Sequence, residues 1–224
     1  MPKAVIFDID GTLIDTVDLH AASWVETFQH FGVEVAHANV RAQIGKGADE
    51  LMPVFLNADV LEKKGRDIER FRSDLFKRNY LVKARPFPCV RDLFKRIRTA
   101  GQTIVLASSC KADEIDRYKE IAGIADLIDA ETTSDDAEHS KPHPDIFQAA
   151  LGCIAPLGPD DAIAVGDTPY DAQAAASAGI RTVGVLCGGF PEADLSAAGC
   201  IRIYRDPEDL LQGYEHSPLA DEDR

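Results

Sequence analysis

Hydrophobic and polar positions along the chain predict a series of short strands. Residues 5–7, Val-Ile-Phe, form an apolar run of β-branched and aromatic side chains, and a polar segment that contains a glycine follows it. Such runs are typical of strands that are buried on both faces of a parallel sheet. Four later segments have a similar character and are predicted to be strands: residues 103–107, 127–130, 162–165 and 180–185.

A helical periodicity begins soon after the first strand. In residues 17–31, apolar side chains recur at three- and four-residue spacings, which predicts an amphipathic helix. Two more helices are predicted at residues 48–61 and 67–80, with the polar run 62–65 between them. No strand pattern is evident between residues 16 and 84. The sequence therefore predicts a helical insertion after the first strand.

Beyond residue 85 the predicted strands alternate with helices. These helices are expected near residues 113–121, 144–151 and 170–178. Such alternation predicts an α/β fold, with a parallel sheet flanked by helices and joined by right-handed crossovers. The expected parts are a core of residues 1–15 and 85–213, a helical cap of residues 16–84, and a frayed, acidic tail of residues 214–224.

Composition and charge restrict the classes of partner. The chain has 224 residues, which suffices for one large domain or for one domain with an insertion. Its formal net charge of −14 argues against nucleic acid or an anionic membrane as a partner and favours small-molecule chemistry. Met1-Pro2-Lys3 leads directly into the first strand, and no apolar stretch is long enough to span a bilayer, so a cytoplasmic protein is expected. The oligomeric state is not predicted.

Polar residues follow three of the predicted strands. Asp8 and Asp10 come after the first, Ser108 after the second and Asp167 after a later one, while Lys141 precedes a helix. Because parallel strands end at the same edge of a sheet, these side chains are expected to converge. Three carboxylates can hold Mg²⁺, a carboxylate can attack phosphorus, and lysine and serine can bind phosphoryl oxygens. The set therefore predicts phosphoryl transfer.

These motifs, in their order along the chain, resemble those of the haloacid dehalogenase superfamily. They are Asp8-Ile9-Asp10-Gly11-Thr12, Ser108, Lys141-Pro142 and Gly166-Asp167-Thr168-Pro169-Tyr170-Asp171. The helical insertion resembles the small cap of the subgroup that contains phosphoglycolate phosphatase and β-phosphoglucomutase. The resemblance implies a Rossmann-like parallel sheet with an inserted all-helical cap.

The resemblance also implies a role for each motif residue. Asp8 would be the nucleophile and Asp10 the general acid and base, while Ser108 and Lys141 would bind the phosphoryl group. Mg²⁺, the implied cofactor, would be held by Asp8, by the backbone carbonyl of Asp10 and by Asp167. Asp171 would support this site from nearby.

Three further residues have two interpretations each. Lys46 stands between two glycines, which would let its loop approach the cleft, although a solvated lysine in a helix connection is the alternative. Ser109 is a second candidate to bind substrate beside Ser108, but both serines also suit the polar end of a strand. For His20, a surface or interface position is favoured over a catalytic one.

The leading functional prediction is a magnesium-dependent phosphatase that hydrolyses a small phosphorylated metabolite through an aspartyl-phosphate intermediate. The first alternative is an isomerase of the β-phosphoglucomutase type. Thr16 and His20 stand where that mutase has equivalents, but Ala48 stands about where it has an arginine that binds the sugar phosphate. The second alternative is a signalling receiver or a catalytically silent binding protein. The order of the motifs and the large insertion disfavour a receiver.

Overall fold

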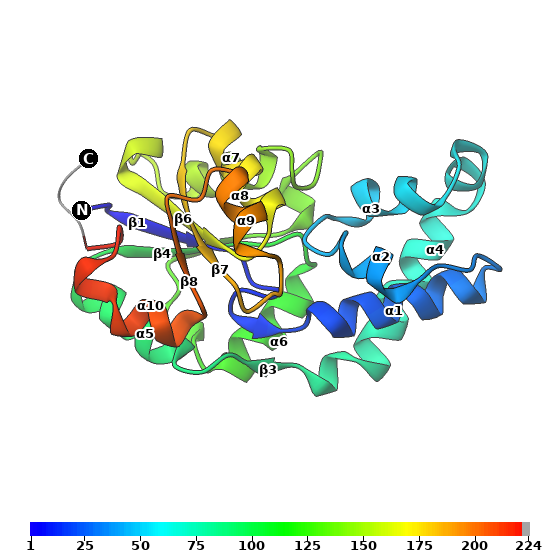
Figure 1. Cartoon of the computed structure of the whole chain (residues 1–224), viewed down its shortest axis with the longest axis horizontal. Helices are drawn as coiled ribbons and strands as arrows, with labels where there is room; N and C mark the ends of the chain where they lie inside the picture. Colours follow the sequence, from blue (N-terminus) through cyan, green and yellow to red (C-terminus); the bar gives the residue numbers. More distant parts are fainter. Residues whose placement is uncertain (221–224) are drawn as a thin grey trace.

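The computed structural model describes residues 1–220, which form a six-stranded sheet, a two-stranded sheet and the helices around them (Figure 1). No helix in this part of the chain is both long and apolar enough to cross a membrane. The strands are β1 (Ala4–Phe7), β2 (Ile14–Asp15), β3 (Arg85–Pro86), β4 (Thr103–Ala107), β5 (Ala130–Thr132), β6 (Ala162–Gly166), β7 (Arg181–Val185) and β8 (Arg202–Tyr204). The helices are α1 (Val17–His30), α2 (His37–Arg41), α3 (Ala48–Phe55), α4 (Ala58–Asn79), α5 (Val90–Thr99), α6 (Ala112–Ala122), α7 (Asp145–Cys153), α8 (Pro169–Ser177), α9 (Glu192–Ala197) and α10 (Pro207–Gln212).

The large sheet is parallel and has the order β5-β4-β1-β6-β7-β8. β1 lies inside it, paired with β4 on one side and with β6 on the other. Alternate residues of a strand point to opposite faces. Accordingly, Val5 and Phe7 join a hydrophobic cluster with α5, α6 and α10, whereas Ala4 and Ile6 join a second cluster with α7 and α8. The predicted α/β architecture, with helices on both faces of a parallel sheet, is confirmed.

Helices α1 to α4 form the inserted cap and pack around a third hydrophobic cluster. Trp24 and Phe28 of α1 meet Leu51 of α3 and Ile68 of α4 in this cluster. The chain enters the cap through β2 and leaves it through β3, and the two strands pair antiparallel with Ile14 opposite Pro86. Figure 1 shows the four helices together, to one side of the sheet.

The boundary between α3 and α4 differs from the sequence prediction. A break was expected at residues 62–65, but α3 ends at Phe55 and α4 runs through that polar segment without interruption. The Asn57 side chain accepts a hydrogen bond of 3.0 Å from the Val60 amide and so caps the start of α4. Residues 62–64 are exposed, whereas Gly65, in the same helix, is buried. Glu62, Lys63 and Lys64 are of residue types that favour helix, so their polarity did not indicate a break.

Two other expectations need correction. The predicted strand at residues 127–130 is displaced, because a 3-10 turn occupies Ala125–Leu127 and β5 begins at Ala130. The expected frayed tail is wrong for residues 214–220, while residues 221–224 lie outside the described part. Tyr214 and Leu219 are buried, and Gln102 donates a hydrogen bond of 2.9 Å to the Leu219 carbonyl.

Replacing Leu219 with alanine tests this packing. Because Leu219 is fully buried, Leu219→Ala is expected to lower the free energy of unfolding by about 2–5 kcal/mol, as measured by urea denaturation. Ile201→Ala is the matched control, since Ile201 is 45% exposed, and its effect should stay within about 0.5 kcal/mol. Equal, small effects of both substitutions would show that the packing of residues 214–220 contributes nothing to stability.

Candidate active site

The candidate site lies where three neighbouring strands end. Asp8 follows β1, Ser108 follows β4 and Asp167 follows β6, and these strands are adjacent and parallel. Asp10 lies two residues beyond Asp8, and Lys141 reaches the same place from the segment before α7. The structure therefore brings together residues that are far apart in the sequence.

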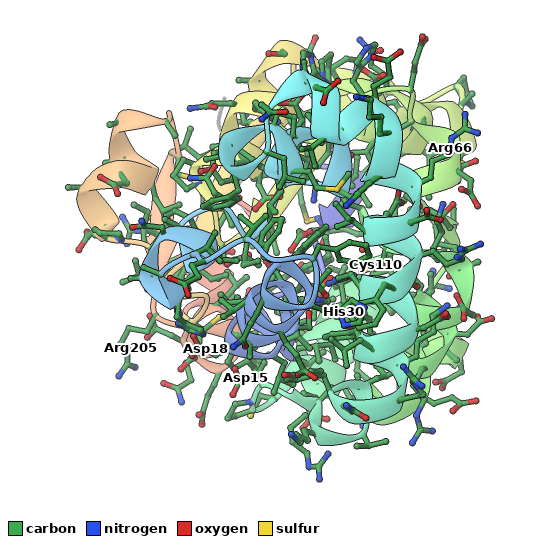
Figure 2. The ribbon with its side chains drawn as sticks, turned by 90° about the vertical axis from the view of Figure 1, so that its right-hand side faces the viewer. Asp15, Asp18, His30, Arg66, Cys110 and Arg205 are labelled. Carbon is green, nitrogen blue, oxygen red and sulfur yellow. The ribbon has the colours of Figure 1, made fainter. Side chains whose placement is uncertain are left out.

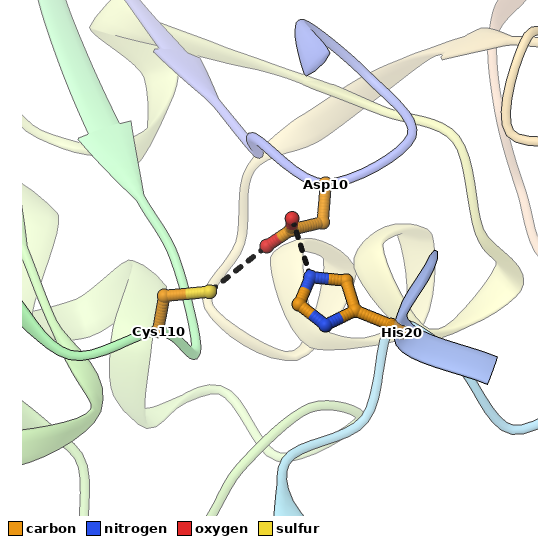
Figure 3. Close-up of side chains that lie close together, drawn as sticks. All are labelled: Asp10, His20 and Cys110. Carbon is orange, nitrogen blue, oxygen red and sulfur yellow. Dashed lines mark hydrogen bonds and ion pairs between the residues drawn. The ribbon is translucent and has the colours of Figure 1, made fainter. Parts of the chain in front are cut away.

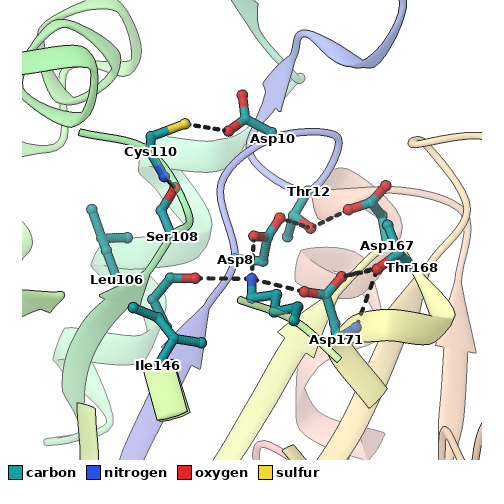
Figure 4. A network of polar contacts seen from close by, with 12 residues as sticks. Asp8, Asp10, Thr12, Leu106, Ser108, Cys110, Ile146, Asp167, Thr168 and Asp171 are labelled. Atoms are coloured by element: carbon teal, nitrogen blue, oxygen red, sulfur yellow. Dashed lines mark hydrogen bonds and ion pairs between the residues drawn. The ribbon is translucent and has the colours of Figure 1, made fainter. Parts of the chain in front are cut away.

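Lys141 is at the centre of the site, with only 1% of its side chain exposed. Its Nζ lies 2.6 Å from Asp8 Oδ1, 2.8 Å from Asp171 Oδ1 and 3.0 Å from the Ala107 carbonyl oxygen. Burial disfavours the charged ammonium, but the charges of Asp171 and Asp8 outweigh burial and hold the pKa of Lys141 above its ordinary value. Lys141 is therefore a buried cation with three acceptors, of which Asp8 and Asp171 are labelled in Figure 4.

Three buried carboxylates lie close together here, and two of them, Asp8 and Asp171, contact Lys141. Asp8, Asp167 and Asp171 each present an oxygen within 4.8 Å of the others. The Thr12 hydroxyl lies 3.1 Å from Asp8 Oδ2 and 3.0 Å from Asp167 Oδ1, so it can donate its one hydrogen to either. Burial is the main cause that raises the pKa values of Asp8 and Asp167, and the neighbouring carboxylates raise them further. With Lys141 charged, three ionised carboxylates would leave the group with a charge of −2, since −3 + 1 = −2.

This group fits a hard divalent cation. The atoms that could bind the ion are the carboxylate oxygens of Asp8, Asp167 and Asp171, and such ions prefer oxygen ligands. Asp167 Oδ2 is buried and has no hydrogen-bond partner among the described residues. Gly11 and Gly188 lie so close to that carboxylate that a Cβ at either position would collide with it. Asp171 is differently placed, because its Oδ2 accepts hydrogen bonds from the Thr168 amide (3.0 Å) and hydroxyl (2.7 Å) at the start of α8.

Asp10 points away from the three carboxylates and has separate partners. Its Oδ1 accepts hydrogen bonds from the Thr16 hydroxyl at 2.6 Å and from His20 Nε2 at 2.8 Å. Its Oδ2 accepts one from the Cys110 thiol at 2.9 Å (Figure 3). Burial disfavours the ionised carboxylate, but the interaction with His20 and the bonds from Cys110 and Thr16 hold the pKa of Asp10 well below its ordinary value.

His20 lies between the cap and the core. It is buried, it stacks on Phe76 with ring centroids 4.1 Å apart, and its Nδ1 contacts the Arg72 guanidinium. Because a guanidinium can only donate, Nδ1 is the acceptor and Nε2 carries the hydrogen that faces Asp10. His20 thus occupies an interface, but it contacts a candidate catalytic group directly. Sequence reasoning assigned no role to Arg72 or Cys110, and neither has a motif that would have identified it.

The remaining candidates are less closely tied to the carboxylates. Ser108 is buried at the end of β4, and its hydroxyl accepts a hydrogen bond from the Cys110 amide. Ser109 lines the cavity. Lys46 also lines it, but its Nζ donates to Gln43 Oε1 at 2.7 Å and lies 4.8 Å from the centre of the Tyr170 ring.

The glycines beside Lys46 have a packing role. Gly45 has a φ of +107°, and a Cβ there would press on the Thr168 side chain. A Cβ at Gly47 would collide with the Ser140 side chain. Small residues therefore allow this cap loop to rest against the core.

A cavity of about 530 Å³ lies between the core and the cap. Asp8 and Asp10 lie at its core side, and α1, α3 and α4 supply much of its cap side. Figure 2 views the molecule from the cap, with Arg66 of α4 at the outer edge. The site therefore combines a polar, metal-compatible centre with a cavity that the core and the cap line together.

Comparisons with known proteins relate the chain to one family. The sequence model described as haloacid dehalogenase-like hydrolase matches residues 5–185. A pyrophosphatase PpaX from Bacillus velezensis is 30% identical over 183 residues, which cover 81% of this chain and 82% of that protein. A phosphoglycolate phosphatase from Nitrosospira multiformis is 29% identical over 186 residues, or 79% and 80% of the two chains. The crystal structure of a hydrolase from Pseudomonas syringae has a TM-score of 0.88 at 25% identity, covering 96% of this chain and 98% of that one.

Removing the central cation should destabilise the core. Lys141→Ala leaves Asp8 and Asp171 buried without their counter-charge, so the free energy of unfolding at neutral pH is expected to fall by about 3–5 kcal/mol. Lys3→Ala is the control, because 65% of the Lys3 side chain is exposed beside Asp161, and such pairs contribute about 0–1 kcal/mol. Chemical denaturation measures both. A loss for Lys141→Ala no larger than that of the control would refute the central role of this ion pair.

Proposed function

The chain belongs to the haloacid dehalogenase-like hydrolase family, and from this membership and the geometry of its site we propose that it is a magnesium-dependent phosphatase. Its substrate would be a small phosphorylated metabolite. The observation that supports the proposal most is Asp8, a buried carboxylate that contacts Lys141 and Thr12 at the core side of the cavity between core and cap. A location in the cytoplasm stays a prediction from the sequence.

In the proposed reaction, Asp8 is the nucleophile. One carboxylate oxygen forms a bond to phosphorus, the ester P–O bond breaks, and the leaving oxygen takes a proton from Asp10. In the second half, Asp10 accepts a proton from a water molecule that attacks the phosphorus of the aspartyl phosphate. The Asp8–phosphorus bond then breaks, which releases phosphate and restores the Asp8 carboxylate.

The contacts of Asp10 impose a condition on this sequence. His20 and Thr16 favour its ionised form, which is a base and not an acid. To protonate the leaving oxygen, Asp10 must first gain a proton and exchange part of these contacts for substrate. The Oδ2 atom suits that exchange better than Oδ1, because the one donor to it within residues 1–220 is the Cys110 thiol, which is a weak donor.

Mg²⁺ would be held by the Asp8 and Asp167 carboxylates and by the backbone carbonyl of Asp10. When bound, the ion would neutralise negative charge on the phosphoryl oxygens. Asp167 Oδ2, which has no hydrogen-bond partner within residues 1–220, supports this assignment. Asp171 would act indirectly, because it holds Lys141.

Four residues are proposed to contact the substrate. Lys141 and Ser108 would bind the phosphoryl group, with Ser109 beside them. Lys46 would face the non-phosphate end, for which it must leave Gln43 and turn into the cavity that it lines. The names of the two relatives in sequence, a pyrophosphatase and a phosphoglycolate phosphatase, support a phosphorylated small molecule as substrate.

A phosphoryl-transferring isomerase is the second candidate. The bonds of Thr16 and His20 to Asp10 favour it, since both residues stand where β-phosphoglucomutase has equivalents. Ala48, which lines the cavity, offers no charge for a sugar phosphate and favours the hydrolase. Release of one phosphate per substrate consumed identifies a hydrolase, whereas an isomerase converts substrate without releasing phosphate. The family match gives no support to a receiver or a silent binding protein.

Loss of the proposed nucleophile should abolish turnover. Asp8→Asn removes an attacking anion and a metal ligand, so phosphate release from a generic aryl phosphate is expected to fall by at least about a thousandfold. Asp15→Asn is the control, because Asp15 is an exposed acid in the same segment and should retain activity. Near-normal turnover by a folded Asp8→Asn protein would exclude the mechanism.

Metal dependence can be measured with and without turnover. Chelation should eliminate phosphate release, Mg²⁺ should restore it, and Ca²⁺ should do so poorly because its coordination shell is larger and looser. Mg²⁺ should also raise the thermal midpoint of the wild-type protein, because binding stabilises the folded state. Asp167→Asn is expected to reduce that shift. Full turnover in excess chelator contradicts the proposal.

A further inference from the structure

Gly65 stands at an unusual place in the cap. It is buried in the middle of α4, a 22-residue helix, and it lines the cavity above the carboxylates. A Cβ at this position would meet nothing within 4 Å, and its φ lies outside the left-handed region. Neither packing nor backbone conformation therefore calls for glycine here, although glycine weakens a helix interior relative to alanine.

Other glycines of the site show the contrast. At Gly11, Gly47, Gly166 and Gly188, an added Cβ would collide with a neighbouring side chain, so protein packing accounts for the missing side chain. At Gly65 the missing side chain only enlarges the cavity. The space itself is therefore the feature that glycine provides at this position.

The position of Gly65 along α4 indicates how far a ligand must extend from the catalytic residues to fill that space. Leu61, Gly65, Glu69 and Arg72 line the cavity at intervals of four, four and three residues, which places them along one face of the helix. Arg72 marks the catalytic end, because it contacts His20, which is bonded to Asp10. Seven residues separate Arg72 from Gly65, and at 1.5 Å per residue this is about 10 Å.

A ligand group that reaches the gap must therefore be extended. The leaving group of a two-carbon acid phosphate is shorter than the roughly 10 Å that separate Arg72 and Gly65 along α4. The cavity volume of about 530 Å³ lies within the usual range for ligands of drug size. The cavity lining includes the apolar side chains of Met52 and Leu61, and Arg66 follows Gly65 in the chain. These walls suit a group with an apolar face and polar edges.

We propose that Gly65 is a specificity-determining residue, and that the gap it leaves accepts the far end of a leaving group about as long as a nucleoside. The preferred substrate would then be a phosphate monoester of nucleoside size, in place of a short phosphorylated acid. This inference rests on the proposed phosphatase function and defines its substrate class.

The test compares substitutions at two helical glycines. Gly65→Ala and Gly65→Leu fill the gap in steps, and Gly152→Ala is the matched control. Gly152 lies in α7, its added Cβ also meets nothing within 4 Å, and it is exposed, away from the residues that line the cavity. The substrates are 2-phosphoglycolate, glucose 6-phosphate, uridine 5′-monophosphate and the generic p-nitrophenyl phosphate.

The wild-type protein is expected to hydrolyse uridine 5′-monophosphate with the highest kcat/KM of the three metabolites. Gly65→Leu should lower that value by about tenfold or more. It should change the value for 2-phosphoglycolate by less than about twofold, since that leaving group ends short of the gap. Gly65→Ala should raise the thermal midpoint by about 2–4 °C and Gly152→Ala by a similar or smaller amount, but only the Gly65 substitutions should change selectivity.

Several results would overturn the inference. These are a wild-type preference for 2-phosphoglycolate, equal losses on short and extended substrates, or no loss in either Gly65 variant. If Gly65→Leu fails to fold, Gly65→Ala and the wild-type preference still decide. Phosphate release from none of the four substrates would instead refute the proposed phosphatase function, which separates the two failures.

Discussion

The ion pair between Lys141 and its two aspartates is the interaction on which the site depends. The three acceptors of the Lys141 ammonium belong to different segments: Asp8 follows β1, Ala107 ends β4 and Asp171 lies in α8. A buried ammonium is costly without counter-charges, and a buried carboxylate is costly without a cation. The groups therefore stabilise one another only when the strands and the helix are in register. The site therefore depends on the same packing of strands and helix that forms the core.

The sequence sufficed for the sheet and for the acids at its edge. Short apolar runs identify strands, and residues that follow parallel strands must meet, so Asp8 and Asp167 could be placed without coordinates. Side-chain direction could not be predicted, because the turn of Asp10 toward His20 and Cys110 depends on packing between distant segments. The packing of residues 214–220 could not be predicted for the same reason, since Gln102, which bonds to Leu219, lies more than a hundred residues earlier.

Asp10 connects the chemistry to the position of the cap. Two of its donors, Thr16 and His20, are at the start of the cap, whereas Cys110 belongs to the core. A displacement of α1 relative to the sheet would change the partners of Oδ1 and leave the thiol at Oδ2. The protonation preference of this carboxylate is thus coupled to how closely the cap sits on the core.

The pairing of β2 with β3 has a mechanical consequence. Two chain segments connect the cap to the core, and the pairing of Ile14 with Pro86 holds them side by side. A movement of the cap that preserves this pairing would pivot where β2 and β3 lie. The opposite edge of the cap is fastened by Arg41, which donates to the Gly188 carbonyl, and by Asp49, which accepts from the Ser140 amide. A cap that pivots at β2 and β3 would therefore break the hydrogen bonds of Arg41 and Asp49, which lie on the side of the metal-compatible carboxylates.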